Sequence, residues 1–312
     1  KTYTVTEIRN IKENKGLIEI KLPDTITRIS EWAISQNYDL RRINFPESLR
    51  IIEEGAFWGC TSLKKLELPA CGLCKCAFAF CEGVTKLVMT GVTSIGDEVF
   101  KDLKSLKSVV LPPSIEEIGP RTFSNCTKLK TIILNEGLQS IDLGSFDNCG
   151  IEELFIPKSV RSIRGYSSLS RLKSIFVDTD NEKYCSVDGV LYSKDMSSLE
   201  YCPACYEGEF IVPDGVKTIS NCAFYYCENI TKVVIPDSVE YIGSESFEGC
   251  NNMQTVIIGN GVREIGEEAF KWCEKLSSVV FCNGIERIEE RAFKNCRSLV
   301  TVELPSSIQR YS

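Results

Sequence analysis

The chain has 312 residues, of which 43% are apolar and 25% are charged, a composition typical of a folded globular protein. Its net charge of −7, from 36 basic and 43 acidic side chains, disfavours general nucleic-acid binding. Histidine is absent, which excludes Ser-His-Asp and Cys-His catalysis and removes the commonest ligand of transition metals. No run of about 18 apolar residues is present, so we expect no membrane insertion. No signal peptide is visible after Lys1.

One pattern recurs along almost the whole chain at a spacing of about 23 residues. It is clearest in 111–134, LPPSIEEIGPRTFSNCTKLKTIIL, and in 235–258, IPDSVEYIGSESFEGCNNMQTVII. Such a period is typical of a solenoid, in which each coil buries its apolar face only against its neighbours. We therefore expect a single solenoid over 1–312 with about 11–13 repeats.

Each repeat opens with a segment predicted to form a β-strand, because its apolar residues alternate and are mostly β-branched. Proline often follows, as at Pro112 and Pro236, and ends the strand because it has no N–H for a ladder bond. We expect these strands to stack as one parallel sheet on the concave side. Their inward-facing residues are Ile20, Ile43, Leu66, Leu87, Val109, Ile132, Leu154, Ile175, Phe210, Val233, Val256, Val279 and Val302.

The second half of each repeat carries another apolar pair, such as Ile115 and Ile118, then a glycine, an aromatic residue and usually a cysteine three positions later. Because the aromatic residue and the cysteine are one helical turn apart, we expect short helical or 3-10 turns on the convex side. These turns would make the fold an α/β-type solenoid. The aromatic position holds Phe57, Phe78, Phe100, Phe123, Phe146, Phe224, Phe247, Phe270 and Phe293, with Ile34 and Tyr166 as substitutes.

The repeat spacing is interrupted once, between Leu172 and Phe210, by about a dozen extra residues. Asp188 and Gly189 lie there between apolar residues, which is a strong signal for a two-residue hairpin turn. We expect a β-hairpin inserted within 178–206 and projecting from the solenoid.

Three motifs identify a family. They are the IGxxAFxxC core, the LPxSV before it, and the insert pattern NxxYxSxDGVLY, here Asn181 to Tyr192. With them the chain resembles the BspA-like leucine-rich repeat family from about Leu17 to the end. The resemblance implies a right-handed leucine-rich-repeat superhelix that is secreted or cell-surface attached and takes part in adhesion. The repeat expected at Tyr166 departs from the pattern, because no cysteine follows at the usual spacing.

Half of the sixteen cysteines share one repeat position, three residues after the aromatic residue. Repeat register alone predicts this placement, so we interpret these thiols as buried packing groups. They are Cys60, Cys81, Cys126, Cys149, Cys227, Cys250, Cys273 and Cys296.

Cys71, Cys74, Cys76 and Cys81 form C-x2-C-x-C-x4-C, a spacing that suggests zinc. However, Cys81 belongs to the packed position and no second knuckle lies nearby, so we expect no metal and no cofactor.

Cys202 and Cys205 form a C-x-x-C pair in the insert. A catalytic pair needs a helix N-terminus to lower the thiol pKa, and none is predicted here. We interpret these as loop cysteines and expect a disulfide between them or with Cys185.

The residue after each inward-facing strand residue should lie on the exposed face of the sheet. Nine consecutive repeats are apolar at this position: Val88, Val110, Ile133, Phe155, Phe176, Ile211, Val234, Ile257 and Val280. Strand propensity alone would also favour such residues. A run of nine nevertheless exposes more apolar surface than monomers usually tolerate. We predict that the stripe, centred on Phe155 and Phe176, binds a protein segment or a second copy of the chain.

Basic residues precede the strands of the first repeats: Arg41, Arg42, Lys64, Lys65, Lys86, Lys107 and Lys130. They could steer an acidic protein or a sulfated glycan, but a solvated rim is the more common role of such a run, and we favour it.

The residues therefore predict a non-catalytic module that binds proteins through the concave face of the solenoid, and the resemblance implies that it is secreted or at the cell surface. The alternative is a structural or self-associating surface protein that buries the stripe between copies. Whether the chain stays monomeric at micromolar concentration separates the two.

Overall fold

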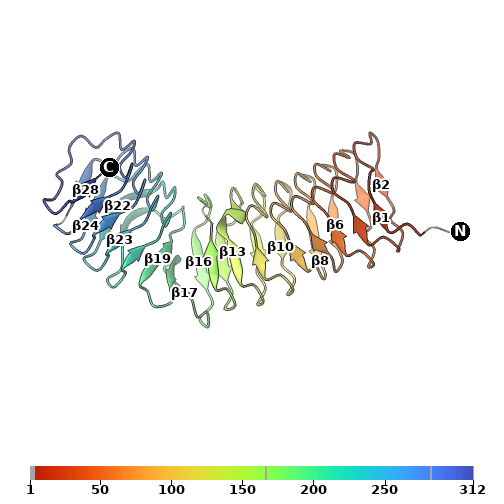
Figure 1. The fold of residues 1–312 in the computed structure, drawn as a ribbon, viewed down its shortest axis with the longest axis horizontal. Helices are drawn as coiled ribbons and strands as arrows, with labels where there is room; N and C mark the ends of the chain where they lie inside the picture. Colours follow the sequence, from red (N-terminus) through yellow and green to blue (C-terminus); the bar gives the residue numbers. More distant parts are fainter. Residues whose placement is uncertain (1–3, 166, 282, 312) are drawn as a thin grey trace. The chain divides into compact units, whose positions relative to one another are not determined.

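The computed structural model describes residues 4–165, 167–281 and 283–311. They form two compact units, 1–169 and 170–312, and each is a stack of coils (Figure 1). The substitute aromatic residue expected at Tyr166 lies outside the described residues.

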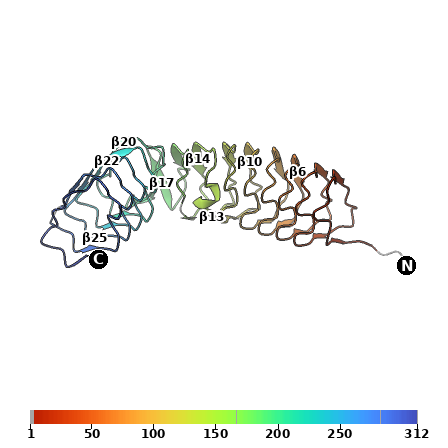
Figure 2. The same cartoon turned by 90° about the horizontal axis from the view of Figure 1, so that it is seen from above.

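Each coil of the first unit contributes short strands to two rows, which lie on opposite sides of the coil (Figure 2). Many neighbouring strands of a row pair in parallel, as in β10–β12 and β11–β13. The pairing is interrupted along the first row, so its strands form several short parallel sheets and not the one continuous sheet that was expected. The first row contains β2 (Glu19–Ile20), β4 (Arg42–Ile43), β6 (Lys65–Leu68), β8 (Lys86–Met89), β10 (Ser108–Val110), β12 (Thr131–Ile133) and β14 (Glu153–Ile156). The second row contains β1 (Glu7–Ile8), β3 (Arg28–Ile29), β5 (Ile51–Ile52), β7 (Gly72–Leu73), β9 (Ser94–Ile95), β11 (Glu117–Ile118), β13 (Ser140–Asp142) and β15 (Ser162–Arg164).

The second unit repeats the two-row plan. Its first row contains β16 (Ser174–Val177), β20 (Gly208–Ile211), β22 (Ile230–Ile235), β24 (Thr255–Ile258) and β26 (Ser278–Val280). Its second row is an eight-stranded sheet of β17 (Tyr184–Val187), β18 (Val190–Ser193), β19 (Ser198–Tyr201), β21 (Thr218–Ile219), β23 (Tyr241–Ile242), β25 (Glu264–Ile265), β27 (Arg287–Ile288) and β28 (Arg310–Tyr311). Both units are therefore parallel-sheet β-solenoids.

Twelve of the thirteen predicted strands are present, from β2 at Ile20 to β26 at Val279. The thirteenth is not, because the described backbone around Val302 forms no strand. Apart from the two hairpin strands β17 and β18, the second row was not predicted as strands. Most of its strands are only two residues long, which is too short for a visible alternation of apolar and polar residues.

The expected helical turns, and with them the α/β-type assignment, are wrong. In the described chain the one helical element is a four-residue 3-10 helix, Leu143–Phe146. Elsewhere the aromatic-x-x-Cys segments are chains of turns. The N–H groups of Phe123 and Asn125 donate to the carbonyl oxygens of Ser145 and Asp147 on the next coil, at 2.9 and 2.8 Å.

The intervening N–H groups of these segments donate to carbonyls three residues back, as from Cys126 to Phe123 at 3.1 Å. Left-handed residues with positive φ recur in the same segments, among them Arg121 (55°) and Asn125 (61°). An α-helix requires negative φ throughout and a bond from each N–H to the carbonyl four residues back. The alternation between bonds to the next coil and bonds within the coil therefore replaces a helix.

Stacked phenylalanine rings fill the core of both units. Phe57 and Phe78 have ring centroids 5.0 Å apart and planes 9° apart, and Phe247 and Phe270 have centroids 5.0 Å apart and planes 2° apart. These rings are fully buried, and burial of a phenylalanine side chain contributes roughly 1.5–3 kcal/mol.

The eight repeated cysteines are all buried, as predicted, but they also form hydrogen bonds. Sγ of Cys126 donates to the carbonyl oxygen of Phe100 at 3.2 Å, and Sγ of Cys149 to that of Phe123 at 3.1 Å. Cys60, Cys250, Cys273 and Cys296 make the same bond to the residue 26 positions back. The thiol is therefore a weak donor that links each coil to the one before it.

Asn37 takes the place of the cysteine in the coil whose aromatic position is Ile34. Its Nδ2 donates to the carbonyl oxygens of Ile11 at 2.9 Å and Ile34 at 2.7 Å, and its Oδ1 accepts from the N–H of Asn14 at 2.9 Å. The fully buried amide thus replaces the hydrogen bond that a cysteine thiol makes to the previous coil, and it makes two further hydrogen bonds.

The predicted hairpin is present. Strands β17 and β18 pair antiparallel, and Asp188 (φ 50°) and Gly189 (φ 78°) form the turn between them. The hairpin does not project, however, because β18 also pairs with β19, which joins the second row beside β21. Val190 and Tyr192 are buried in the core of the second unit. The insert therefore adds strands to the second row and side chains to the core of the second unit.

We expect Asn37→Ala to lower the free energy of unfolding by about 2–3 kcal/mol, because it leaves a buried N–H and two carbonyls without this partner. Asn37→Cys is the matched control, since a thiol can restore the bond to Ile11. Urea denaturation measures both variants. An equal loss in the two would contradict a role for the inter-coil bond.

Candidate binding surface

The outer face of the first strand row carries an apolar stripe. Strand alternation turns Val109 into the core, where it is 1% exposed, and leaves Val110 60% exposed. Phe155 on β14 is 50% exposed. The apolar stripe consists of Val88, Val110, Ile133 and Phe155 in the first unit and of Phe176, Ile211, Val234, Ile257 and Val280 in the second. Each of these nine predicted residues is exposed or half-buried.

Small polar side chains lie beside the stripe. Ser108 and Thr131 are exposed on β10 and β12, and Thr255 and Ser278 are half-buried at the same position of β24 and β26. No charged side chain occupies the outer face of these four strands, so the apolar surface there is not interrupted by ions that a partner would have to desolvate.

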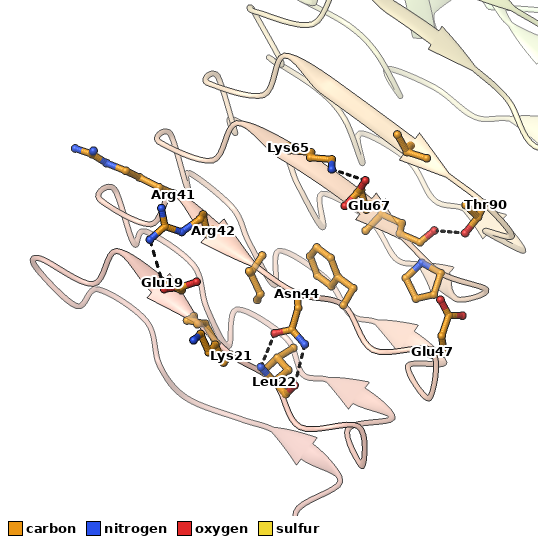
Figure 3. Close-up of a pocket in the computed structure, with 16 residues that line it drawn as sticks. Glu19, Lys21, Leu22, Arg41, Arg42, Asn44, Glu47, Lys65, Glu67 and Thr90 are labelled. Carbon is orange, nitrogen blue, oxygen red and sulfur yellow. Dashed lines mark hydrogen bonds and ion pairs between the residues drawn. The ribbon is translucent and has the colours of Figure 1, made fainter.

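The other end of the same face in the first unit is polar and hollow. A groove of about 840 Å³ lies over β2, β4 and β6 (Figure 3). Arg42 pairs with Glu19 at 3.4 Å, and Lys65 pairs with Glu67. The amide of Asn44 bonds to both backbone groups of Leu22, which prolongs the β2–β4 ladder. The groove therefore has mixed charge.

The predicted basic residues, Arg41, Arg42, Lys64, Lys65, Lys86, Lys107 and Lys130, are all exposed on the first unit. The acidic partners of Arg42 and Lys65 lie among them, and Glu47 also lines the groove. Because positive and negative charges are mixed along this rim, it attracts polyanions only weakly. The geometry therefore favours the interpretation of the basic residues as a solvated rim and not as a binding site.

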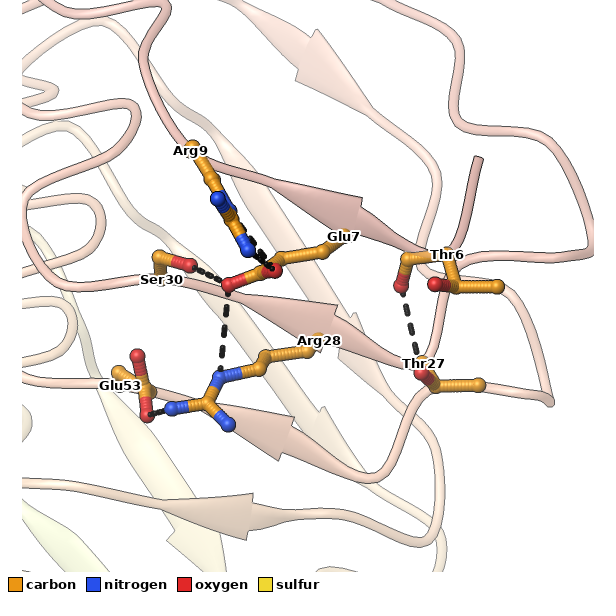
Figure 4. Close-up of polar contacts among 7 residues, drawn as sticks. All are labelled: Thr6, Glu7, Arg9, Thr27, Arg28, Ser30 and Glu53. Atoms are coloured by element: carbon orange, nitrogen blue, oxygen red, sulfur yellow. Dashed lines mark hydrogen bonds and ion pairs between the residues drawn. The ribbon is translucent and has the colours of Figure 1, made fainter. Parts of the chain in front are cut away.

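At the start of the second strand row, the polar side chains of the outer face pair with one another (Figure 4). Glu7 accepts from the hydroxyl of Ser30 and from Arg9, and these bonds lower the pKa of Glu7 in that order of size. Arg28 lies between Glu7, at 3.7 Å, and Glu53. Such paired charges provide little free energy for a partner.

The cysteines with zinc-like spacing do not form a cluster. Among the described residues, no three of the sulfur atoms of Cys71, Cys74, Cys76 and Cys81 lie within 4.8 Å of one another. Sγ of Cys81 donates to the carbonyl of Phe57 at 3.2 Å, as its ladder position predicts. Burial raises the pKa of Cys71 to about 12, which disfavours the thiolate that binds metals.

The expected disulfide in the insert is wrong, since none of the fifteen described cysteines is in a disulfide. The thiols face different carbonyls: Sγ of Cys205 donates to Ser170 at 3.4 Å, and Sγ of Cys185 to Ser193 at 3.3 Å. Cys202 is buried next to Cys227, whose Sγ donates to the carbonyl of Cys202. Although Cys185, Cys202 and Cys205 are close in the sequence, their thiol groups do not pair in the structure.

Sequence reasoning missed one cluster, of Glu245, Glu248 and Glu268, whose carboxylate oxygens lie within 4.8 Å of one another. Nζ of Lys271 lies 3.2 Å from Glu248 and 2.6 Å from Glu268, so an ammonium already pairs with two of the three carboxylates. Burial raises the pKa of Glu248, whereas the bond from Lys271 lowers that of Glu268. The sequence did offer one signal for this cluster, because glutamates stand two residues before both Phe247 and Phe270 and therefore lie on neighbouring coils.

The sequence profile of the BspA-type leucine-rich repeat region matches the chain over 7–101, 72–175 and 197–312, in six copies. The chain belongs to this family. A crystal structure described as a leucine-rich cell surface protein of Faecalibacterium prausnitzii A2-165 is 26% identical, covers 95% of this chain and 82% of its own, and superposes with a TM-score of 0.66. None of the curated proteins matches the chain.

Two further structures share the fold. A leucine-rich repeat protein of Bacteroides ovatus ATCC 8483 is 23% identical over 100% of this chain and 89% of its own, with a TM-score of 0.65. The pneumococcal vaccine antigen PcpA is 20% identical over 97% and 78%, with a TM-score of 0.53. The BspA-type chain itself has no helix, among the described residues, with the length and apolar character needed to span a bilayer.

We expect the chain to elute from a heparin column below about 0.15 M NaCl, because a net charge of −7 and acids placed among the basic rim leave little attraction that survives screening. Lys64→Glu with Lys65→Glu should leave the elution unchanged. Strong retention that this double variant abolishes would restore the rim as a polyanion site.

We expect the stability of the fold to fall between about pH 8.5 and 12, because burial raises the pKa of Cys60 to about 12 while an unfolded thiol titrates near 8.5. Over this interval the unfolded state binds one proton fewer per buried thiol, so stability decreases as pH rises, by about 1.4 kcal/mol per pH unit for one thiol. Denaturation of Cys60→Ala at several pH values should give a shallower decline than wild type. A decline as steep as that of the wild type, or as that of Cys205→Ala, would contradict this assignment.

Proposed function

We propose that this BspA-type solenoid is a non-catalytic protein-binding module of the adhesion type, secreted or displayed at the cell surface. The observation that carries the proposal is the apolar stripe, which exposes large apolar side chains such as Phe155 on a strand of the first unit and Phe176 on a strand of the second. The description of the related Faecalibacterium protein as a cell surface protein supports the location.

The energy available from the stripe is sufficient for specific binding. A partner that covered about 400 Å² of apolar surface would gain about 10 kcal/mol before the costs of association. Rigid strands hold the stripe in place, so few side chains lose freedom when a partner binds, and this lowers one of those costs.

The non-catalytic part of the proposal rests on the side chains present. The chain has no histidine, and its family is defined by a repeat. Burial raises the pKa of Cys60, Cys71 and Cys74, so these thiols are poor nucleophiles at neutral pH.

The alternative, self-association of the same face, has the same structural support, because an exposed apolar stripe is complementary to a second copy of itself. In that arrangement the stripe would be covered in the assembled protein. Light scattering over a micromolar concentration series distinguishes the two, since an adhesion module remains at the monomer mass of 35.0 kDa.

We expect Phe155→Asp with Phe176→Asp to weaken binding at least tenfold, because the charges would have to be desolvated against the partner. The measurement is surface plasmon resonance against a panel of purified extracellular matrix proteins. Val5→Asp, which changes an exposed valine away from the stripe, is the matched control. Equal affinity of the wild type and the double variant for every bound protein would refute the proposal. A wild-type dimer that the double variant dissociates would favour self-association.

A further inference from the structure

A row of aromatic side chains lies on the turn segments of the first unit, away from both strand rows. Trp32, Trp58 and Phe80 come from three consecutive coils. The ring centroids of Trp32 and Trp58 are 6.3 Å apart, and those of Trp58 and Phe80 are 5.2 Å apart. Trp32 is 38% exposed and the other two are half-buried. We call these three residues the aromatic row.

The backbone places these rings at some cost. Phe80 has a φ of 62°, a left-handed conformation that bulky side chains rarely adopt. The same position of other coils holds Gly59, Asn125 and Asn148, which tolerate it more easily. Trp32 is also left-handed, with a φ of 54°. The same two positions are left-handed in other coils, for example at Arg121 (55°) and Trp272 (58°), so the conformation is a property of the repeat that the rings occupy.

A glycine makes room for the first ring. A Cβ atom on Gly55 would lie 2.5 Å from Cε3 of Trp32, so the indole lies directly against the bare backbone of the next coil. Support from the backbone on one side fixes the ring and leaves its remaining surface to solvent, as the exposure of Trp32 indicates.

We propose that the aromatic row binds a neutral oligosaccharide chain. The face of an aromatic ring carries partial negative charge and attracts weakly positive C–H groups, of which the flat side of a sugar ring presents several. One ring per coil provides successive stacking positions along such a chain. The proposal concerns a different surface from the apolar stripe and does not depend on it.

The surroundings of the row define the ligand class. Glu31 precedes Trp32 in the sequence, and Glu98 bonds to Lys101 over the ring of Phe80, so carboxylates close to the row would repel an anionic glycan. Nζ of Lys101 already lies 5.9 Å from the ring centre of Phe80 and bonds to Glu98, so a cation site there is occupied. Three rings are also far smaller than the roughly 800 Å² per partner of a standard protein interface.

Polar groups for sugar hydroxyls lie beside Trp58. Gln36 and Tyr38 both reach the space next to Gly59, where each would lie 3.9 Å from a Cβ atom. The hydroxyl of Tyr38 donates to Oε1 of Gln36 at 3.4 Å, a long bond that leaves hydrogen-bonding capacity on both groups. Tyr38 is 55% exposed.

Tryptophan fluorescence tests the proposal, because two of the three tryptophans of the chain belong to the row. The wild type is titrated with cellohexaose, maltohexaose, mannohexaose and chitohexaose, each also measured by calorimetry. We expect at least one of them to bind. Trp32→Ala with Trp58→Ala should lower its affinity at least tenfold, while Trp272→Ala, an exposed tryptophan of the second unit, should leave it unchanged.

Gly55→Ala is a second variant that keeps all three rings and places a Cβ atom against the indole of Trp32, and its affinity should also fall. Circular dichroism confirms that each variant is folded. Binding by none of the four sugars would overturn the proposal, as would an affinity that survives the double tryptophan variant. Binding of hexalysine or of a heparin hexasaccharide at the row, in place of the neutral sugars, would also overturn it.

Discussion

The hydrogen bond from the backbone N–H of most core aromatic residues to the next coil is the constraint on which the rest depends. Phe123 donates to Ser145, and Phe247 donates to Ala269 in the same way. This bond sets the aromatic rings one above another and brings each repeated thiol to the carbonyl of the previous coil. Once coils are aligned in this way, both strand rows must run in register. The face on which Val110 and Phe155 lie is therefore a consequence of bonds on the opposite side of the coil.

The repeat made much of this predictable. A side chain that recurs at one register position must be buried in every coil or exposed in every coil, so the phenylalanines, the cysteines and the outward residues were all assigned correctly to inside or outside. The helical turns were wrong because a spacing of three between Phe123 and Cys126 fits successive turns as well as a helix, and positive φ at Arg121 leaves no trace in the sequence. The second row was missed because two-residue strands have no periodicity. The aromatic row was missed because Trp32, Trp58 and Phe80 occupy three different repeat positions and meet only in space.

The surfaces of the solenoid differ in how completely their side chains are paired with one another. On the second row, Arg28 joins Glu7 and Glu53, and at the turns Lys271 pairs with Glu248 and Glu268. Those regions have little left to offer a ligand. The apolar stripe and the aromatic row, in contrast, expose apolar and aromatic side chains that the packing of the core does not require. Two separate recognition surfaces on one scaffold are consistent with a protein whose coils need only bury their shared interior.

The registers of the second row have a consequence for how such a chain changes over generations. Successive partners are offset by 21 residues between Glu7 and Arg28, by 23 between Arg28 and Ile51, and by 22 between Gly72 and Ser94. The loops thus absorb an insertion or deletion of one or two residues without disturbing the ladder. Gain or loss of a whole coil, for example by unequal recombination between similar repeats, would likewise preserve the interior. Length and surface can therefore diversify rapidly while the stacking rule stays unchanged.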